Sequence, residues 1–341
     1  MQAFSCFMIM NQYMNFNGRI DTGEKALTLC CESLPGNAHV PGVSLEGDAE
    51  DVLERFLGMR NTVITNSLKE GDRAKTVTKE NSWLGCKRCV NYQKGDWQPQ
   101  LMVTYVNLSM YPAPCQCRCC YCDVAKRWEN TESVQTAYEK MFAVLELAEK
   151  RGVIAPNAVW QISSGEITIH PYKERIYELV GSRRAVYYTN GFIYDEAIAG
   201  QLKRNEGSAI NLSIDAGTPE TWREVKGVDN FEEVCMNLAD YFKASSRPGQ
   251  ISLKYIILPG INDSEKDYAG LMEIMDVLKV PHLTLSRDIH IKYGSNRKQH
   301  TALLSAAARL ARHCRQNGIT IDMFAFAESE RAEIMQIASR L

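Results

Sequence analysis

The stretch "PCQCRCCYCD", Pro114 to Asp123, places five of the chain's twelve cysteines within eight positions. Three of these cysteines, Cys115, Cys119 and Cys122, have the spacing CxxxCxxC. A zinc site normally takes two ligands from one short loop and two from another. Three thiolates on a single loop instead suit one [4Fe–4S] cluster in which one iron has no protein ligand. The spacing therefore predicts that Cys115, Cys119 and Cys122 bind a cluster with an open iron.

Two further cysteines of this loop, Cys117 and Cys120, form a competing CxxC pair. Choosing them as ligands breaks the spacing of three and then two residues. We therefore expect them to be packed or partly exposed thiols, and a second metal-binding role for them stays open.

The residues around the cysteine loop alternate between apolar, β-branched segments and amphipathic helical ones, which predicts βα units and a parallel sheet. Apolar side chains recur at steps of four and three in the expected helix after the loop, at Val134, Tyr138, Met141, Leu145 and Ala148. Six strands, and so an open or partial barrel, are expected at residues 101–110, 158–164, 185–191, 209–216, 251–260 and 283–291. The loop then lies at the carboxyl end of the first strand, where parallel barrels keep their catalytic groups.

The cysteine motif, the aromatic Tyr121 before its last cysteine and the position after the first strand together resemble the radical S-adenosylmethionine (SAM) superfamily. The resemblance implies an α/β fold with a partial (β/α)6 barrel. It also implies that SAM chelates the fourth iron and is cleaved by an electron from the cluster to a 5′-deoxyadenosyl radical, which abstracts hydrogen from the substrate. The cofactor carries this chemistry, and the protein supplies placement and exclusion of water. A reductant such as flavodoxin or ferredoxin is implied as a partner.

A segment after the second strand, "SSGEITIHP", resembles the glycine–glycine–glutamate segment of that family, with serine in place of the first glycine. The resemblance implies that Ser164, Gly165 and Glu166 contact the amino group of SAM. Glu166 also has a structural interpretation, as a carboxylate favoured by a helix dipole at the start of a helix.

Three later segments, "YTNG", "NLSIDAGTPETWREVKG" and "LKYIILPGIND", extend the resemblance in the expected order. The resemblance also implies that Tyr121 and Asn190 contact the cofactor. The end of the third strand, "YTNG", contributes Asn190, and "NLSIDAGTPETWREVKG" resembles the fourth-strand segment, which implies that Ser213 and Asp215 lie near the SAM ribose or carboxylate. The alternative is that Ser213 and Asp215 are only turn residues. Arg287 falls at the mouth of the sixth strand, where a cation can meet a carboxylate of SAM or substrate, or can form an ordinary ion pair.

The first hundred residues contain five further cysteines and no regular βα alternation. They offer four ligand positions from three segments, and their spacing resembles the SPASM-type auxiliary-cluster segments that follow the barrel in most radical SAM relatives. The resemblance implies a second, auxiliary [4Fe–4S] cluster; a zinc or iron–sulfur staple for a small domain, or no metal at all, are the alternatives. The residues concerned are Cys6, either Cys30 or Cys31, Cys86 and Cys89.

We therefore expect three parts in the chain. Residues 1–99 form a small, irregular, SPASM-like domain with the additional cysteines. Residues 100–295 form the radical SAM partial barrel, and residues 296–341 form a helical extension.

Composition and charge exclude several classes of protein. A formal net charge of −2 and a pI near 6.3 argue against a nucleic-acid partner, which normally requires a basic surface. No apolar run is long enough to cross a bilayer, and the first residues lack the features of a signal peptide. We expect a cytoplasmic protein, in which clustered cysteines are ligands or redox groups rather than disulfides.

The resemblance favours a peptide or protein substrate, because SPASM-like segments most often accompany peptide maturation. An epimerase or dehydrogenase that acts on a sugar or another small molecule is the alternative. Outside this class, both cysteine groups could hold structural zinc in an interaction protein. Cys235 lies on the apolar face of an expected helix and is interpreted as a packing residue, although some radical SAM epimerases use a cysteine as hydrogen donor.

Overall fold

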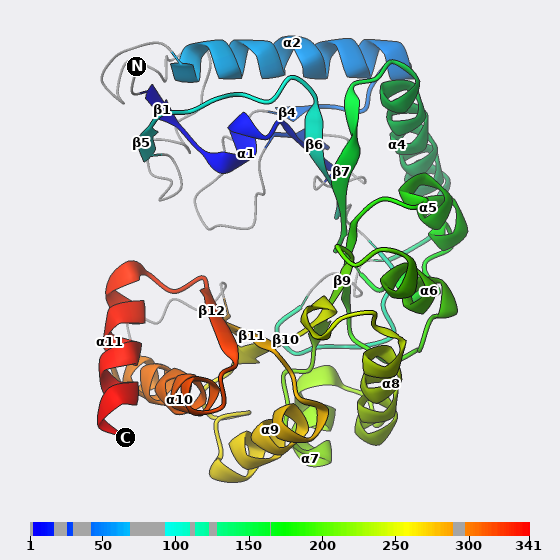
Figure 1. The fold of residues 1–341 in the computed structure, drawn as a ribbon. Helices are drawn as coiled ribbons and strands as arrows, with labels where there is room; N and C mark the ends of the chain where they lie inside the picture. Colours follow the sequence, from blue (N-terminus) through cyan, green and yellow to red (C-terminus); the bar gives the residue numbers. More distant parts are fainter. Residues whose placement is uncertain are drawn as a thin grey trace. The chain divides into compact units, whose positions relative to one another are not determined.

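The computed structural model describes residues 3–16, 26–29, 42–68, 93–109, 113–122, 128–163, 165–288 and 297–341 (Figure 1). Its contacts divide the chain into two compact units, which are described separately. Unit 1 contains Met1–Pro114, Arg127–Gly165 and Glu174–Arg184, and unit 2 contains Cys115–Lys126, Glu166–Lys173 and Ala185–Leu341. The cysteine loop therefore belongs to unit 2.

The main sheet of unit 1 has the order β7-β6-β2-β3-β4. Its first three strands pair in parallel and its last two pair antiparallel. These strands are β2 (Tyr13–Phe16), β3 (Leu27–Thr28), β4 (Gly42–Val43), β6 (Val103–Leu108) and β7 (Ile154–Ile162), and a separate antiparallel pair joins β1 (Ala3–Ser5) to β5 (Gln93–Gly95). The parallel pairing of β2 with β6 places a strand of the first hundred residues beside the first predicted strand, so the division into units differs from the expected boundary near residue 100.

The helices of unit 1 are α1 (Phe7–Met10), α2 (Ala49–Leu68), α4 (Glu132–Lys150) and most of α5 (Lys173–Val180). Helix α4 begins where the Thr131 hydroxyl accepts a hydrogen bond from the Val134 amide, as an N-cap residue should. The five apolar residues predicted to share one face of this helix are all buried. The predicted helix and its packing face are thus confirmed.

The sheet of unit 2 consists of parallel strands in the order β12-β11-β10-β9-β8. They are β8 (Ala185–Thr189), β9 (Ala209–Ser213), β10 (Ile251–Ile257), β11 (His282–Arg287) and β12 (Thr320–Phe324). The first four match predicted strands, while β12 was not counted among them. The α/β class with a parallel sheet is confirmed.

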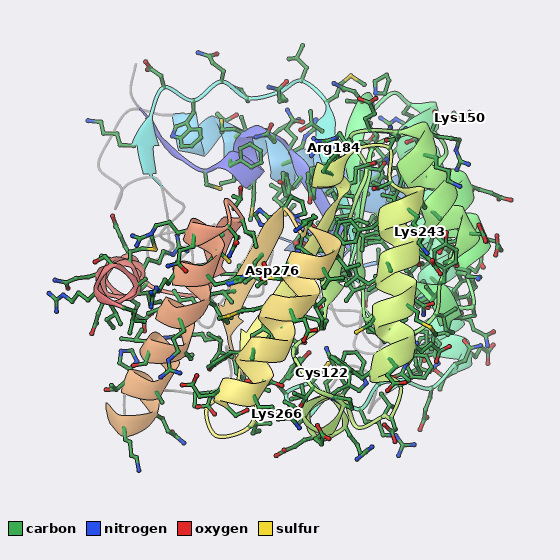
Figure 2. All side chains as sticks on the ribbon, turned by 60° about the horizontal axis from the view of Figure 1, so that its bottom comes forward. Cys122, Lys150, Arg184, Lys243, Lys266 and Asp276 are labelled. Carbon is green, nitrogen blue, oxygen red and sulfur yellow. The ribbon has the colours of Figure 1, made fainter. Side chains whose placement is uncertain are left out.

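Helices follow the strands of unit 2, and α10 packs against β10, β11 and β12 (Figure 1). Lys243 marks the carboxyl end of α8, and Lys266 and Asp276 mark the two ends of α9 (Figure 2). In the described part of the chain, no helix combines the length and apolar character that a membrane crossing needs. The helices are α6 (Glu196–Arg204), α7 (Pro219–Lys226), α8 (Phe231–Ala244), α9 (Glu265–Leu278), α10 (Arg297–Gln316) and α11 (Glu328–Arg340), with 3-10 turns η2 (Ile167–Ile169) and η3 (Pro248–Gln250).

Candidate functional site

The cysteine loop separates its five thiols by exposure. Cys115, Cys119 and Cys122, the three predicted ligands, are all partly exposed, whereas Cys117 is buried and Cys120 is exposed. None of the described cysteines is in a disulfide. The loop turns at its end, where the Cys122 amide donates to the Cys119 carbonyl at 3.1 Å. The three thiols with the CxxxCxxC spacing therefore share one kind of environment.

Electrostatics favour thiolates at two of these positions. A hydrogen bond with the Cys117 thiol lowers the pKa of Cys115. The same thiol, helped by the positive charge of Lys226, lowers the pKa of Cys119 to about 6, although burial acts in the opposite direction. These hydrogen bonds raise the pKa of Cys117 itself. Lowered pKa values favour the thiolate form at Cys115 and Cys119, and thiolate is the form of cysteine that binds metal.

The donor set of the loop consists of three partly exposed thiols, the ligand type that iron–sulfur clusters take from proteins. Among the residues that the structure describes, no three His, Cys, Asp or Glu side chains are already arranged around one ion position.

Glu166 lies at the amino end of η2 and is fully buried. Its Oε1 accepts from the Thr168 amide at 3.2 Å and the Thr168 hydroxyl at 3.0 Å, and its Oε2 accepts from the Asn190 amide at 2.8 Å. The Thr189 hydroxyl lies within 3.0 Å of both oxygens. Burial raises the pKa of this carboxyl in spite of the hydrogen bonds. The structure thus shows the capping role that was the alternative to a SAM contact.

Asn190 connects the Glu166 carboxylate to the cysteine loop. Its backbone amide donates to Glu166, and its side-chain Nδ2 lies 3.5 Å from the Cys115 sulfur. Its Oδ1 accepts from the Phe192 amide at 2.9 Å, which fixes the orientation of the side chain. The structure therefore brings together Glu166, Asn190 and Cys115, which the sequence placed in three separate segments.

Asp215 is fully buried, and its carboxylate is occupied by the protein. Oδ2 accepts from Lys226 Nζ at 2.5 Å and from the Tyr121 hydroxyl at 2.6 Å, and Oδ1 accepts from the Ile256 amide at 2.6 Å. Lys226 Nζ also lies 3.2 Å from the Tyr121 hydroxyl. Tyr121 and Asp215, both predicted near SAM, are thus partners of one another.

Gly165 occupies a position that only glycine can fill. Its φ is +62°, and a Cβ there would lie 2.5 Å from the Pro114 carbonyl oxygen and 2.7 Å from the Ala113 side chain. Such contacts are too close for any other residue. The glycine therefore lets the segment after β7 approach the residues before the cysteine loop, while Ser164 lies outside the described residues.

Two other predicted SAM contacts stand at strand ends. Ser213 is the last residue of β9 and is partly exposed. Arg287 is the last residue of β11, and its Nη1 forms an ion pair at 2.7 Å with Glu330 Oε1 of α11. The structure thus shows an ion pair for Arg287, the interpretation that was the alternative to a bound carboxylate.

The cysteines predicted to bind an auxiliary cluster are mostly beyond what the structure describes. Cys6 is buried at the amino end of α1. The other four lie outside the described residues and stay predictions: Cys30, Cys31, Cys86 and Cys89.

One face of the unit 2 sheet carries a row of polar residues. Strand register aligns Ser213 with Lys254, Lys254 with Thr284 and Thr284 with Asp322. These side chains are partly or fully exposed, whereas their strand neighbours Leu212 and Leu253 are buried on the other face. Burial lowers the pKa of Lys254, against the opposing influence of nearby negative charges that include Cys122. The row therefore presents one cation beside the cysteine loop.

Sequence reasoning missed the role of Lys226. A lysine in the last turn of a helix, followed by a glycine with φ +69°, has the pattern of an ordinary helix end. Its burial depends on Asp215 and Tyr121, which are distant in sequence. No local signal indicates that this cation is internal.

Comparisons with known proteins place this geometry in context. Residues 114–272 match the family model described as "Radical SAM superfamily". The GTP 3′,8-cyclases of Desulforamulus reducens and Heliobacterium modesticaldum are 25% and 23% identical over 175 and 184 residues, covering 50% and 52% of this chain and 51% of each relative. The chain therefore spans about half the length of the curated relatives it matches. A crystal structure of Streptococcus suis SuiB has a TM-score of 0.50 at 12% identity, over 85% of this chain and 57% of that one, which shows likeness of fold.

Proposed function

We propose that this chain, whose residues 114–272 match the radical SAM superfamily model, is an enzyme that cleaves SAM reductively and removes hydrogen from an organic substrate. The observation that supports this best is the set of three partly exposed thiols on one loop, two of them with lowered pKa values. A [4Fe–4S] cluster held by Cys115, Cys119 and Cys122 would supply the electron for reductive cleavage of SAM and so the radical that would remove hydrogen from the substrate. The proposal replaces the alternative of an interaction protein whose cysteines hold only structural zinc.

In this proposal Cys115, Cys119 and Cys122 hold the cluster. The single S–H of Cys117 can donate to Cys115 or to Cys119, and the exposed Cys120 has no ligand role. A small reductant such as flavodoxin or ferredoxin would deliver the electron. Since a radical reacts with any nearby C–H bond, the chain must also exclude water and position the substrate.

The SAM contacts divide into two groups. Ser213, Gly165 and Ser164 stay proposed direct contacts, with Asn190 at the edge of the same site. Glu166 and Asp215 direct their described hydrogen bonds into the protein, so we assign to them the holding of neighbouring groups instead. Arg287 would reach SAM or substrate only if its ion pair with Glu330 opened.

The polar row supports a hydrogen-bonding substrate with an anionic group. The Lys254 ammonium forms no hydrogen bond or ion pair with any residue that the structure describes, although the Asp215 charge acts on it, and its partial burial makes a counter-ion favourable. A peptide carboxylate meets this requirement, in line with the SPASM-like cysteines of the first hundred residues. A nucleotide meets it as well, and the relatives named GTP 3′,8-cyclase favour that second candidate. A neutral sugar or similar small molecule fits the row less well.

Cluster binding and SAM cleavage are tested on anaerobically reconstituted full-length chain. We expect brown protein that releases 5′-deoxyadenosine with dithionite and SAM. The Cys119→Ala variant should lose both properties, and the Cys120→Ala variant, altered in the same loop, should keep them. Colourless wild-type protein with bound zinc, or loss of iron in Cys120→Ala alone, would contradict the proposal.

The auxiliary cluster is tested by counting iron in the Cys86→Ala variant. A second [4Fe–4S] cluster predicts a loss of about four iron atoms per chain relative to the unaltered protein, with the first cluster retained. Equal iron contents would remove the auxiliary cluster from the proposal, and zinc in the unaltered protein would assign these cysteines to a structural staple.

The substrate class is tested in deuterated solvent. The enzyme, SAM and reductant are incubated with GTP or with candidate peptides, and products are read by mass. Consumption of one class, together with its loss in a Lys254→Met variant, identifies it. Turnover of either class by Lys254→Met at the unaltered rate would remove Lys254 from the substrate site.

A further inference from the structure

The end of helix α7 is attached directly to the cysteine loop. The Arg118 amide donates to the Lys226 carbonyl at 2.8 Å, and the Cys120 amide donates to the Val225 carbonyl at 2.9 Å. Carbonyls in the last turn of a helix have no partner within the helix, so these two are available to the loop. At Gly227 a Cβ would lie 3.0 Å from the Arg118 side chain, which shows how closely the two segments approach.

The same helix end carries a buried cation, Lys226, that contacts a side chain of the loop. Lys226 is 1% exposed and bonds both the Asp215 carboxylate and the Tyr121 hydroxyl. Tyr121 stands between Cys119 and Cys122 in the sequence, and its ring packs on Val225 and Ile256. Asp215 is therefore linked to the cysteine loop by the hydrogen bond that it accepts from the Tyr121 hydroxyl.

Helix α7 is in turn held against α9. The Gly217 amide donates to Asp267 Oδ1 at 2.8 Å, and a Cβ at Gly217 would lie 1.8 Å from the Asp267 carbonyl oxygen. A Cβ at Gly270 of α9 would lie 1.9 Å from the Gly217 carbonyl oxygen. The anchoring thus continues from α9 through α7 to the loop.

We propose that Lys226, Asp215 and Tyr121 form a buried clamp that positions the cysteine loop, and that this is the role of Asp215 rather than contact with SAM. The inference rests on the proposed function, in which Cys119 and Cys122 are cluster ligands. The three are positioning residues, since they act on the cluster through the loop.

The charge arrangement explains why all three members are needed. The Lys226 and Asp215 charges balance each other in a buried site, and the Tyr121 hydroxyl lies within hydrogen-bonding distance of both. Removing one charge of a buried pair leaves the other uncompensated, whereas removing both is far better tolerated. The clamp therefore predicts a specific pattern of rescue.

Hydrogen–deuterium exchange of the full-length, metal-free chain tests the clamp without any enzymatic assay. In Lys226→Met and in Tyr121→Phe, we expect the Arg118 and Cys120 amides to exchange about tenfold faster or more, relative to amides of α8. Tyr241→Phe removes a buried tyrosine hydroxyl that accepts from the Asp195 amide and should leave the loop unchanged. If Lys226→Met does not fold, Tyr121→Phe decides.

Unchanged exchange at both loop amides in the folded variants would overturn the clamp, and so would an equal increase in Tyr241→Phe. In reconstituted protein, Lys226→Met should release iron to a chelator faster than the unaltered chain, and Asp215→Asn combined with Lys226→Met should reverse most of that change. A double variant no better than the single one would also overturn it. If the unaltered chain binds no cluster, the proposed function fails, while the metal-free exchange still decides the clamp.

Discussion

Replacing Glu166 with glutamine tests whether this carboxylate is a structural centre of unit 2. Glutamine keeps the size of the side chain but exchanges one acceptor oxygen for an NH2 donor. If the NH2 stands at the Oε2 position it faces the Asn190 amide, and at the Oε1 position it faces the Thr168 amide. In either orientation the new NH2 group faces a backbone N–H, so two donors point at each other. One buried backbone N–H is then left without an acceptor.

The size of the effect follows from these contacts. The hydroxyls of Thr168 and Thr189 can rotate, so only one backbone amide is lost in each orientation. A buried donor without a partner costs about 1–3 kcal/mol. The remaining hydrogen bonds also weaken, because glutamine is an uncharged acceptor. Removing the cost of burying a charge stabilises the variant and partly offsets this loss. We expect Glu166→Gln to lower the free energy of unfolding by about 2–3 kcal/mol.

Urea unfolding of the metal-free chain, followed by circular dichroism, measures this change. The exposed Glu224 of α7 provides the control, because Glu224→Gln should alter the free energy of unfolding by less than about 0.5 kcal/mol. A change in Glu166→Gln as small as that of the control would refute the assignment. It would also return Glu166 to the group of direct SAM contacts.

Three further outcomes follow from individual residues. Burial lowers the pKa of His170 to about 4, below the ordinary value of 6.5, so stability should fall by about 3 kcal/mol as the pH drops from 6.5 through 4, and acid titration of His170→Asn should show a flatter profile. Gly217→Ala places a methyl group against the Asp267 carbonyl and should lower the free energy of unfolding in urea by more than about 3 kcal/mol. Gly58→Ala, in open space on α2, is the control and should raise it by about 0.5–1 kcal/mol. Similar values for the two variants would contradict the packing. Burial raises the pKa of Cys235 to about 11, so the residue stays a neutral thiol. If Cys235 only packs in the core, Cys235→Ala should leave the substrate-derived product unchanged, and an altered or missing product with 5′-deoxyadenosine still formed would restore a hydrogen-donor role.

Periodic features of the sequence predicted the fold well. The apolar spacing of α4 and the β-branched segments of β6 to β11 are local patterns, and burial in the structure follows them. The pairing of β2 with β6 escaped prediction because a strand of four residues, Tyr13–Phe16, leaves no alternating pattern. Strand β12 escaped because Thr320–Phe324 is largely exposed at the sheet edge.

The sequence indicated candidate residues of the site but not their partners. The cysteine spacing predicts Cys115, Cys119 and Cys122 as cluster ligands, and the structure shows all three partly exposed, while their binding of a cluster stays a prediction. A sequence, however, shows a carboxylate without the donors that surround it. Glu166 and Asp215 both follow strands, as ligand-binding carboxylates do, yet the structure surrounds each with internal donors.

Two lysines of unit 2, Lys226 buried and Lys254 partly exposed, illustrate why burial alone does not assign a role. Lys226 is the more buried of the two lysines, and its charge is paired with Asp215. Its charge is therefore not available to a ligand. Lys254 has no such partner among the described residues, and the polar row on which it stands is partly exposed. A cation in such surroundings lowers its free energy by acquiring an anion, whereas a cation already paired gains nothing from a second one. The asymmetry assigns Lys226 to the architecture of the cysteine loop and leaves Lys254 as the side chain whose charge a substrate or SAM carboxylate would complete.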